Sequence, residues 1–116
     1  MGDPNRQLRA YDVARDGALS NMRILVKFPG NTPFGAGNPD GIKVDVRGDI
    51  WMVGAGGLLV FDPKGKLLGR LQLPIVGTNL TFGDADYKGL YITTYGNALY
   101  HIRTQVQGQV PMYAQR

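Results

Sequence analysis

Asp40 is the residue whose setting first suggests chemistry. It stands in the run Asn38-Pro39-Asp40-Gly41, directly before the apolar stretch at 42–46. Pro-Asp-Gly at such a place favours an Asx turn, in which the aspartate side chain bonds to the backbone two residues on. A carboxylate at the start of a strand is equally suited to hold a ligand, and both interpretations of Asp40 stay open.

Other familiar catalytic patterns are missing from the sequence. There is no cysteine, which excludes a disulfide or a thiolate metal site, and His101 is the sole histidine, which excludes a histidine cluster. No Gly-x-Ser-x-Gly motif accompanies it, so we interpret His101 as a half-buried strand residue. The glycine-rich run at 54–57 leads into another apolar strand and lacks a Gly-Lys-Ser/Thr ending, which predicts a hairpin turn and not a phosphate loop.

Composition narrows the class of protein. The net charge is +4, but the 13 lysines and arginines are spread along the chain, so we expect no nucleic-acid partner. No segment approaches the roughly 20 apolar residues of a membrane span, and the start of the chain lacks the apolar region of a signal peptide. We therefore expect no membrane partner and, by default, a cytoplasmic protein. The 17 glycines and 7 prolines predict many tight turns and an all-β fold.

A repeated pattern organises the chain. The segments GIKVD (41–45), IWMV (50–53) and LLVFD (58–62) recur, after about 38 to 40 residues, as NLTFG (79–83), LYIT (90–93) and ALYHI (98–102). Such a period suits a single four-stranded blade of a β-propeller, and glycine-containing turn signals separate the runs. An earlier partial copy, YDV (11–13) followed by DG (16–17), indicates that the chain enters the pattern halfway through a blade.

These observations predict a partial β-propeller of about two and a half four-stranded antiparallel blades. Residues 1–116 form one incomplete propeller domain in this interpretation. We assign 1–30 to the outer half of one blade, 40–74 to a complete blade and 78–104 to most of a further blade. Residues 105–116 are expected to be an edge segment or a tail.

Several of these runs resemble, in order, the carboxy-terminal part of the SMP-30/gluconolactonase family, which includes luciferin-regenerating-enzyme-like proteins. NPDGIKVD (38–45), GDIW (48–51) and GGLLVFDPKGKLLG (56–69) look like its fifth blade. TNLTFG (78–83), LYIT (90–93) and LYHIR (99–103) are similar to its last blade, and YDV (11–13) with DGALSN (16–21) resembles the outer half of its fourth. The resemblance covers about residues 4 to 104.

The resemblance implies a six-bladed propeller that holds one divalent cation, most often calcium, and opens sugar lactones with water. The family binds the metal through a Glu near its amino terminus, an Asn in its fourth blade and the Asp of a Pro-Asp-Gly motif. Only the last of these maps onto this sequence, at Asp40, which makes Asp40 the expected metal ligand and catalytic residue. Asn79 holds the equivalent place in the next blade. We expect it either to close a turn before the strand or to contact substrate from the central channel of the propeller.

Two functional hypotheses follow. The first is a fragment of a gluconolactonase-like, divalent-metal-dependent hydrolase of sugar lactones that is inactive as an isolated chain, because two of three expected metal ligands are absent. The alternative is a non-catalytic β-sheet binding or structural module that self-associates. An open arc of blades leaves apolar faces in water, so both hypotheses predict self-association or a complementary propeller chain as partner.

Overall fold

The computed structural model describes residues 6–28, 38–54 and 56–112. Over these residues the chain forms nine strands and no α-helix. The strands are β1 (Gln7–Val13), β2 (Leu19–Lys27), β3 (Ile42–Val44), β4 (Ile50–Gly54), β5 (Gly57–Phe61), β6 (Leu67–Leu71), β7 (Gly77–Gly83), β8 (Gly89–Thr94) and β9 (Leu99–Arg103). The connection between the first two assigned segments, 1–30 and 40–74, falls largely outside the described residues.

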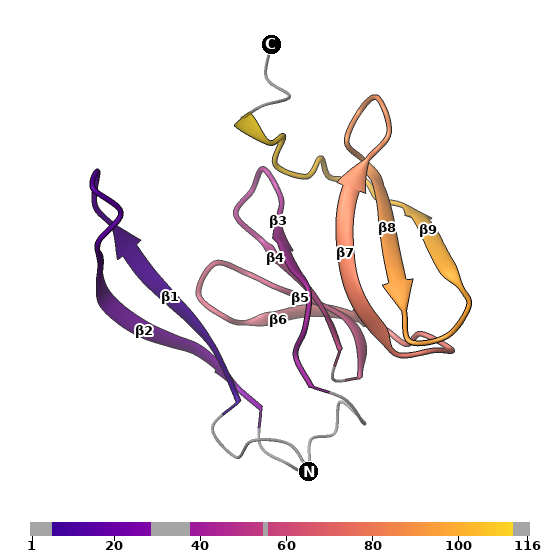
Figure 1. Cartoon of the computed structure of the whole chain (residues 1–116), viewed down its shortest axis with the longest axis horizontal. Coiled ribbons are helices and arrows are strands. Elements are labelled where there is room, and N and C mark those ends of the chain that lie inside the picture. The colour runs from indigo at the N-terminus through magenta and orange to yellow at the C-terminus, as the bar shows by residue number, and fades with distance from the viewer. Residues whose placement is uncertain (1–5, 29–37, 55, 113–116) are drawn as a thin grey trace.

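The strands form three separate antiparallel sheets, which stand side by side in chain order (Figure 1). The first sheet is the pair β1-β2, the second has the order β3-β4-β5-β6, and the third has the order β7-β8-β9. Each strand pairs with the next one along the chain, as expected of sheets built from successive hairpins. The first strands of the second and third sheets, β3 and β7, are therefore edge strands of their sheets.

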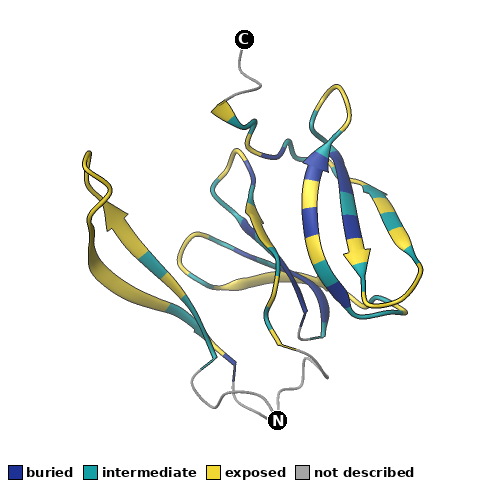
Figure 2. Ribbon diagram, viewed as in Figure 1, coloured by how far each residue is buried: buried dark blue, intermediate teal, exposed yellow. Residues whose placement is uncertain are grey.

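Apolar side chains between the second and third sheets form one core. Val53 and Leu58 of the second sheet pack with Leu80, Leu90 and Ile92 of the third, and all five are buried. The continuous apolar runs of β5 and β8 are largely buried, because these middle strands have a sheet neighbour on each side and a packed face. Figure 2 shows this burial concentrated where the two sheets meet.

A second core joins the first sheet to the second. Phe28 is fully buried and meets the ring of Phe61 edge-on, with ring centroids 6.2 Å apart. Leu8 and Leu25 of the β1-β2 pair reach this cluster, but the other end of the pair does not. Two facing residues at that end, Val13 and Leu19, remain 68% and 61% exposed.

One buried carboxylate ties together the hairpin between β3 and β4. Asp45 has no exposed surface. Its Oδ1 accepts hydrogen bonds from the backbone amides of Arg47 (2.8 Å) and Asp49 (3.0 Å), and its Oδ2 accepts one from the Trp51 indole (2.9 Å). The hairpin between β5 and β6 repeats the backbone part of this arrangement with Asp62. In both hairpins an aspartate closes the turn from within, as Asx turns do.

The segment after β9 crosses back over the second and third sheets. The Gly108 amide donates to the Tyr87 carbonyl of the third sheet (2.8 Å), and the Gln109 amide donates to the Val44 carbonyl of the second (3.0 Å). Gly108 also forms an isolated antiparallel bridge with Asp45. We call residues 105–112 the carboxy-terminal strap, because they bond to both sheets.

Within residues 6–28, 38–54 and 56–112 there is no helix of the length and apolar character needed to cross a membrane.

Candidate functional site

Asp40 lies two residues before β3 and is exposed. Its amide donates to the Val53 carbonyl in β4 (2.9 Å), and the Val53 amide donates to the Gly41 carbonyl (3.0 Å). The strand pairing of β3 with β4 is thus extended backwards to Asp40. The backbone of this residue is fixed, while its carboxylate is accessible to a ligand.

Asn79 lies against the same stretch of backbone, but from the third sheet. The structure places it inside β7, which begins at Gly77, and not before the strand as the turn-closing interpretation expects. Its Oδ1 accepts a hydrogen bond from the Leu80 amide (2.9 Å). The Gly41 amide donates to the carbonyl of Thr78, the residue before Asn79 (3.0 Å). The chain from Asp40 to Gly41 and the start of β7 are therefore direct neighbours.

A groove of about 870 Å³ lies along β3 and β7. It is lined by Ile42 and Lys43 of β3, by Thr81 and Phe82 of β7, and by residues 109–112 of the strap. The alternating residues Ile42 and Val46 border the groove and are 41% and 56% exposed. Strand β3 therefore faces this open groove and is not enclosed in the core.

The carboxylate of Asp40 does not by itself make a metal centre. Over the part of the chain that the structure describes, no group of three or more His, Cys, Asp or Glu side chains is placed to hold a metal ion. Calcium takes about 6–8 oxygen ligands. Asp40 therefore fits the role of one ligand in a larger set, and the described residues do not complete that set.

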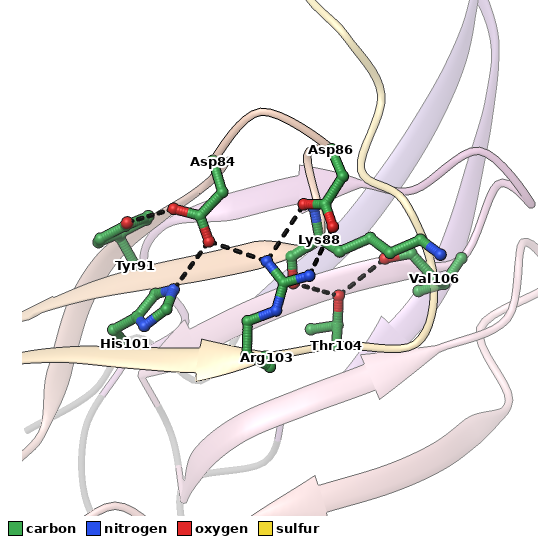
Figure 3. A network of polar contacts seen from close by, with 8 residues as sticks. All are labelled: Asp84, Asp86, Lys88, Tyr91, His101, Arg103, Thr104 and Val106. Carbon is green, nitrogen blue, oxygen red and sulfur yellow. Dashed lines mark hydrogen bonds and ion pairs between the residues drawn. The ribbon is translucent and has the colours of Figure 1, made fainter.

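Sequence reasoning missed a polar network on the third sheet, drawn in Figure 3. Asp84, in the turn after β7, accepts a hydrogen bond from the Tyr91 hydroxyl and one from Arg103 Nη1 (3.0 Å), and it lies 3.0 Å from His101 Nε2. Asp86, in the same turn, pairs with Arg103 Nη2 at 2.5 Å. Tyr91 in β8 is only partly buried, and its hydroxyl joins this network.

The network holds the turn between β7 and β8 against the outer strand β9. Hydrogen bonds, first from Tyr91 and then from His101, lower the pKa of Asp84. Arg103 is the largest cause that lowers the pKa of Asp86 to about 2. The bond to Asp84 in turn raises the pKa of Tyr91. Every member has a partner within the network, which indicates a structural fastening of the turn and not a vacant ligand site.

His101 occupies the third strand of its sheet, as predicted, with 43% of its side chain exposed. Its ring stacks at a tilt on that of Tyr91, with centroids 4.6 Å apart. The sequence held a signal for this contact. Tyr91 is second in the run at 90–93 and His101 is second from the end of the run at 98–102, so an antiparallel hairpin of the two runs brings them together. The pairing register Tyr91↔His101 shows that they face one another across β8 and β9.

Comparison with known proteins identifies the family. Residues 2–96 match the model of the SMP-30/gluconolactonase/LRE-like region. The chain is 38% identical over 88 residues to regucalcin of Danio rerio, covering 72% of this chain and 28% of that protein. It is 41% identical over 90 residues to a pentonolactonase of Haloferax volcanii, covering 75% of this chain and 29% of that protein. The chain thus spans less than a third of the length of these relatives.

Solved structures agree with the sequence matches. A luciferin-regenerating enzyme superposes with a TM-score of 0.76 at 23% identity, over 90% of this chain and 40% of that one, which bears on the fold alone. A gluconolactonase from Xanthomonas campestris superposes with a TM-score of 0.66 at 33% identity, over 89% of this chain and 30% of that one. The predicted fold class, an all-β partial propeller, is confirmed. The chain belongs to the SMP-30/gluconolactonase/LRE-like family.

Proposed function

We propose that this chain supplies part of the active site of a lactonase that hydrolyses sugar lactones, with Asp40 as its contribution to the chemistry. The observation that carries the proposal is the place of Asp40, an exposed carboxylate whose backbone is fixed at the entry to β3. The relatives named as a pentonolactonase and a gluconolactonase support sugar lactones as the proposed substrate class.

In this proposal Asp40 accepts a hydrogen bond from the water that attacks the lactone carbonyl, which orients the water and favours loss of its proton. A divalent cation, calcium first among the candidates, would be held by Asp40 together with ligands beyond those described, and would polarise the bound oxygen atoms. Asn79 contacts the sugar. Its Oδ1 is occupied by the Leu80 amide, which leaves the side-chain nitrogen to donate to a substrate hydroxyl.

The isolated chain is proposed to be inactive, because Asp40 alone cannot satisfy a cation that needs about 6–8 oxygens. Gluconolactone and pentonolactone hydrolysis, followed as acid release, should therefore show no catalysed rate with this chain by itself. In a longer protein that contains these residues, Asp40→Asn should abolish hydrolysis while the protein remains folded. Asp16→Asn, a change at an exposed turn aspartate of the first sheet, is the matched control and should leave the rate unchanged. Equal rates for the two variants would refute a role for Asp40.

A second function is favoured by the open ends of the fold. Among the described strands β9 pairs with β8 alone, so it is an edge strand of the third sheet, and the β1-β2 pair carries exposed Val13 and Leu19. We propose that these surfaces bind another copy of this chain or a complementary propeller chain, as in a non-catalytic structural module. Light scattering after gel filtration tests this proposal, and a monomer that persists at micromolar to millimolar concentration would overturn it.

A further inference from the structure

The backbone around Asp40 is held from two sheets at once. On one side, the Asp40 amide bonds to Val53 in β4 (2.9 Å). On the other side, the next amide, that of Gly41, bonds to Thr78 in β7 (3.0 Å). Asp40 is therefore placed by the seam between the second and third sheets and not by its own hairpin alone.

Gly41 permits this close approach because it has no side chain. A Cβ atom built on Gly41 would lie 2.5 Å from Asn79 Cα and 2.4 Å from Asn79 Oδ1. Real Cβ atoms essentially never come closer than 3.0 Å to such neighbours. Gly41 is not among the glycines with a positive φ, so space and not backbone torsion requires glycine here.

Gly54, the last residue of β4, approaches the same backbone from within the second sheet. Its φ is 130°, a backbone conformation that residues other than glycine rarely adopt. A Cβ built on it would lie 1.9 Å from the Asn38 carbonyl oxygen and 3.1 Å from the Asp40 amide nitrogen. The first glycine of the run at 54–57 therefore has a role that a hairpin turn does not need.

We infer that Gly41 and Gly54 are positioning residues for Asp40, because their missing side chains let two sheets clamp the backbone that carries its carboxylate. The inference rests on the proposed function only in giving Asp40 a chemical role. It adds that the place of this carboxylate depends on contact between blades. Separating the second sheet from the third should break the Gly41–Thr78 bond and leave the backbone of Asp40 held by β4 alone.

Amide hydrogen exchange measured by NMR tests the clamp in this chain. Gly54→Ala should speed exchange of the Asp40 amide by about tenfold or more relative to the change at Ile92, a fully buried residue of β8 that reports on general loosening. Gly41→Ala should act in the same way on its own amide. A purely structural role would raise exchange at Ile92 by the same factor, and that result would overturn the inference.

Two matched controls separate space from torsion. Gly17 has a φ of 88° with nothing within 4 Å of its built Cβ, and Gly69 has an open Cβ position without a positive φ. Alanine at either position should leave the exchange of the Asp40 amide, relative to that of Ile92, unchanged. If Gly17→Ala altered that ratio as much as Gly54→Ala does, backbone strain and not the clamp would be the cause.

The wild-type protein gives a further test that does not depend on any variant folding. Nuclear Overhauser effects should join the α-protons of Gly41 to the α-proton of Asn79, and the α-protons of Gly54 to the Asp40 amide. Their absence would overturn the clamp. Neither measurement needs a lactone or a cation. A protein that keeps the clamp but hydrolyses lactones equally fast with Asp40→Asn and with Asp16→Asn would therefore refute the proposed function alone.

Discussion

Replacing Asp45 with alanine should be among the most damaging single changes to the second sheet. The substitution removes a fully buried carboxylate that accepts hydrogen bonds from the Arg47 amide, the Asp49 amide and the Trp51 indole. Leaving a buried donor without its acceptor costs about 1–3 kcal/mol per group. Water can reach the amide of exposed Arg47, so we expect a total loss of about 3–5 kcal/mol in the free energy of unfolding.

A loss of this size is a large part of the stability of a small domain, which is about 5–15 kcal/mol. For a chain of this length it corresponds to a fall in Tm of roughly 10–20 °C. Trp51 is the only tryptophan in the chain, so its fluorescence reports the unfolding and also the environment of the indole that loses its acceptor. Asp45→Asn keeps one acceptor oxygen and should lie between wild type and Asp45→Ala.

Asp62→Ala is the matched control for this prediction. Asp62 closes the hairpin between β5 and β6 through two backbone amides, those of Lys64 and Lys66, but it has no indole partner and is more accessible. Its loss should lower Tm by clearly less than the loss of Asp45. Equal effects of the two substitutions would show that burial and the Trp51 bond add nothing, and would refute the reasoning.

Two further predictions concern the third sheet and the strap. Asp86, with a pKa lowered to about 2 by Arg103, contributes stability that is present above its ordinary value of 3.8 and is lost as the pH falls through about 2. Arg103→Gln should therefore be less stable than wild type in urea at pH 6, and the two midpoints should converge as the pH approaches 2. Gly108→Ala should destabilise the protein by about 1–3 kcal/mol and alter Trp51 fluorescence, because a Cβ there would lie 2.1 Å from the Phe82 ring, which packs edge-on against the indole.

Both of these predictions have controls in the same protein. Arg70→Gln removes an arginine that bonds the Gly56 carbonyl and, among the described residues, pairs with no carboxylate, so its effect in urea should not change between pH 6 and pH 2. Gly69→Ala introduces a Cβ with nothing within 4 Å and should leave both Tm and fluorescence unchanged. A stability difference between wild type and Arg103→Gln that stays constant with pH would contradict the assignment of the low pKa to this ion pair.

The fold could be predicted because its signals are local and repeated. Strands β4, β5 and β8 are short apolar runs bounded by glycine turns, and such runs form buried strands wherever sheets stack on both sides. The burial of individual residues in the alternating strand was harder to predict. Ile42 and Val46 carry the alternation of a half-buried strand, yet both are exposed, because β3 lies at a sheet edge beside an open groove.

The candidate site was predictable only in part. Asp40 stands out through its Pro-Asp-Gly sequence, which is a local motif. The contacts of Asp84 with His101 and Arg103 join residues that are 17 and 19 positions apart, and they depend on the register of three strands. Asp45 looks like any turn aspartate in the sequence. Its bridge to Gly108 of the strap joins residues that are far apart in the chain, and no local pattern predicts such a contact.

The strap and the clamp at Gly41 lie toward opposite ends of β3 and β7. At one end, Gly41 bonds to β7 beside Asp40, and at the other the strap bonds to both Val44 and Tyr87. Each connection joins the second sheet to the third, so rotation of one sheet about its neighbour would have to break both. It follows that the geometry of Asp40 is a property of two packed blades.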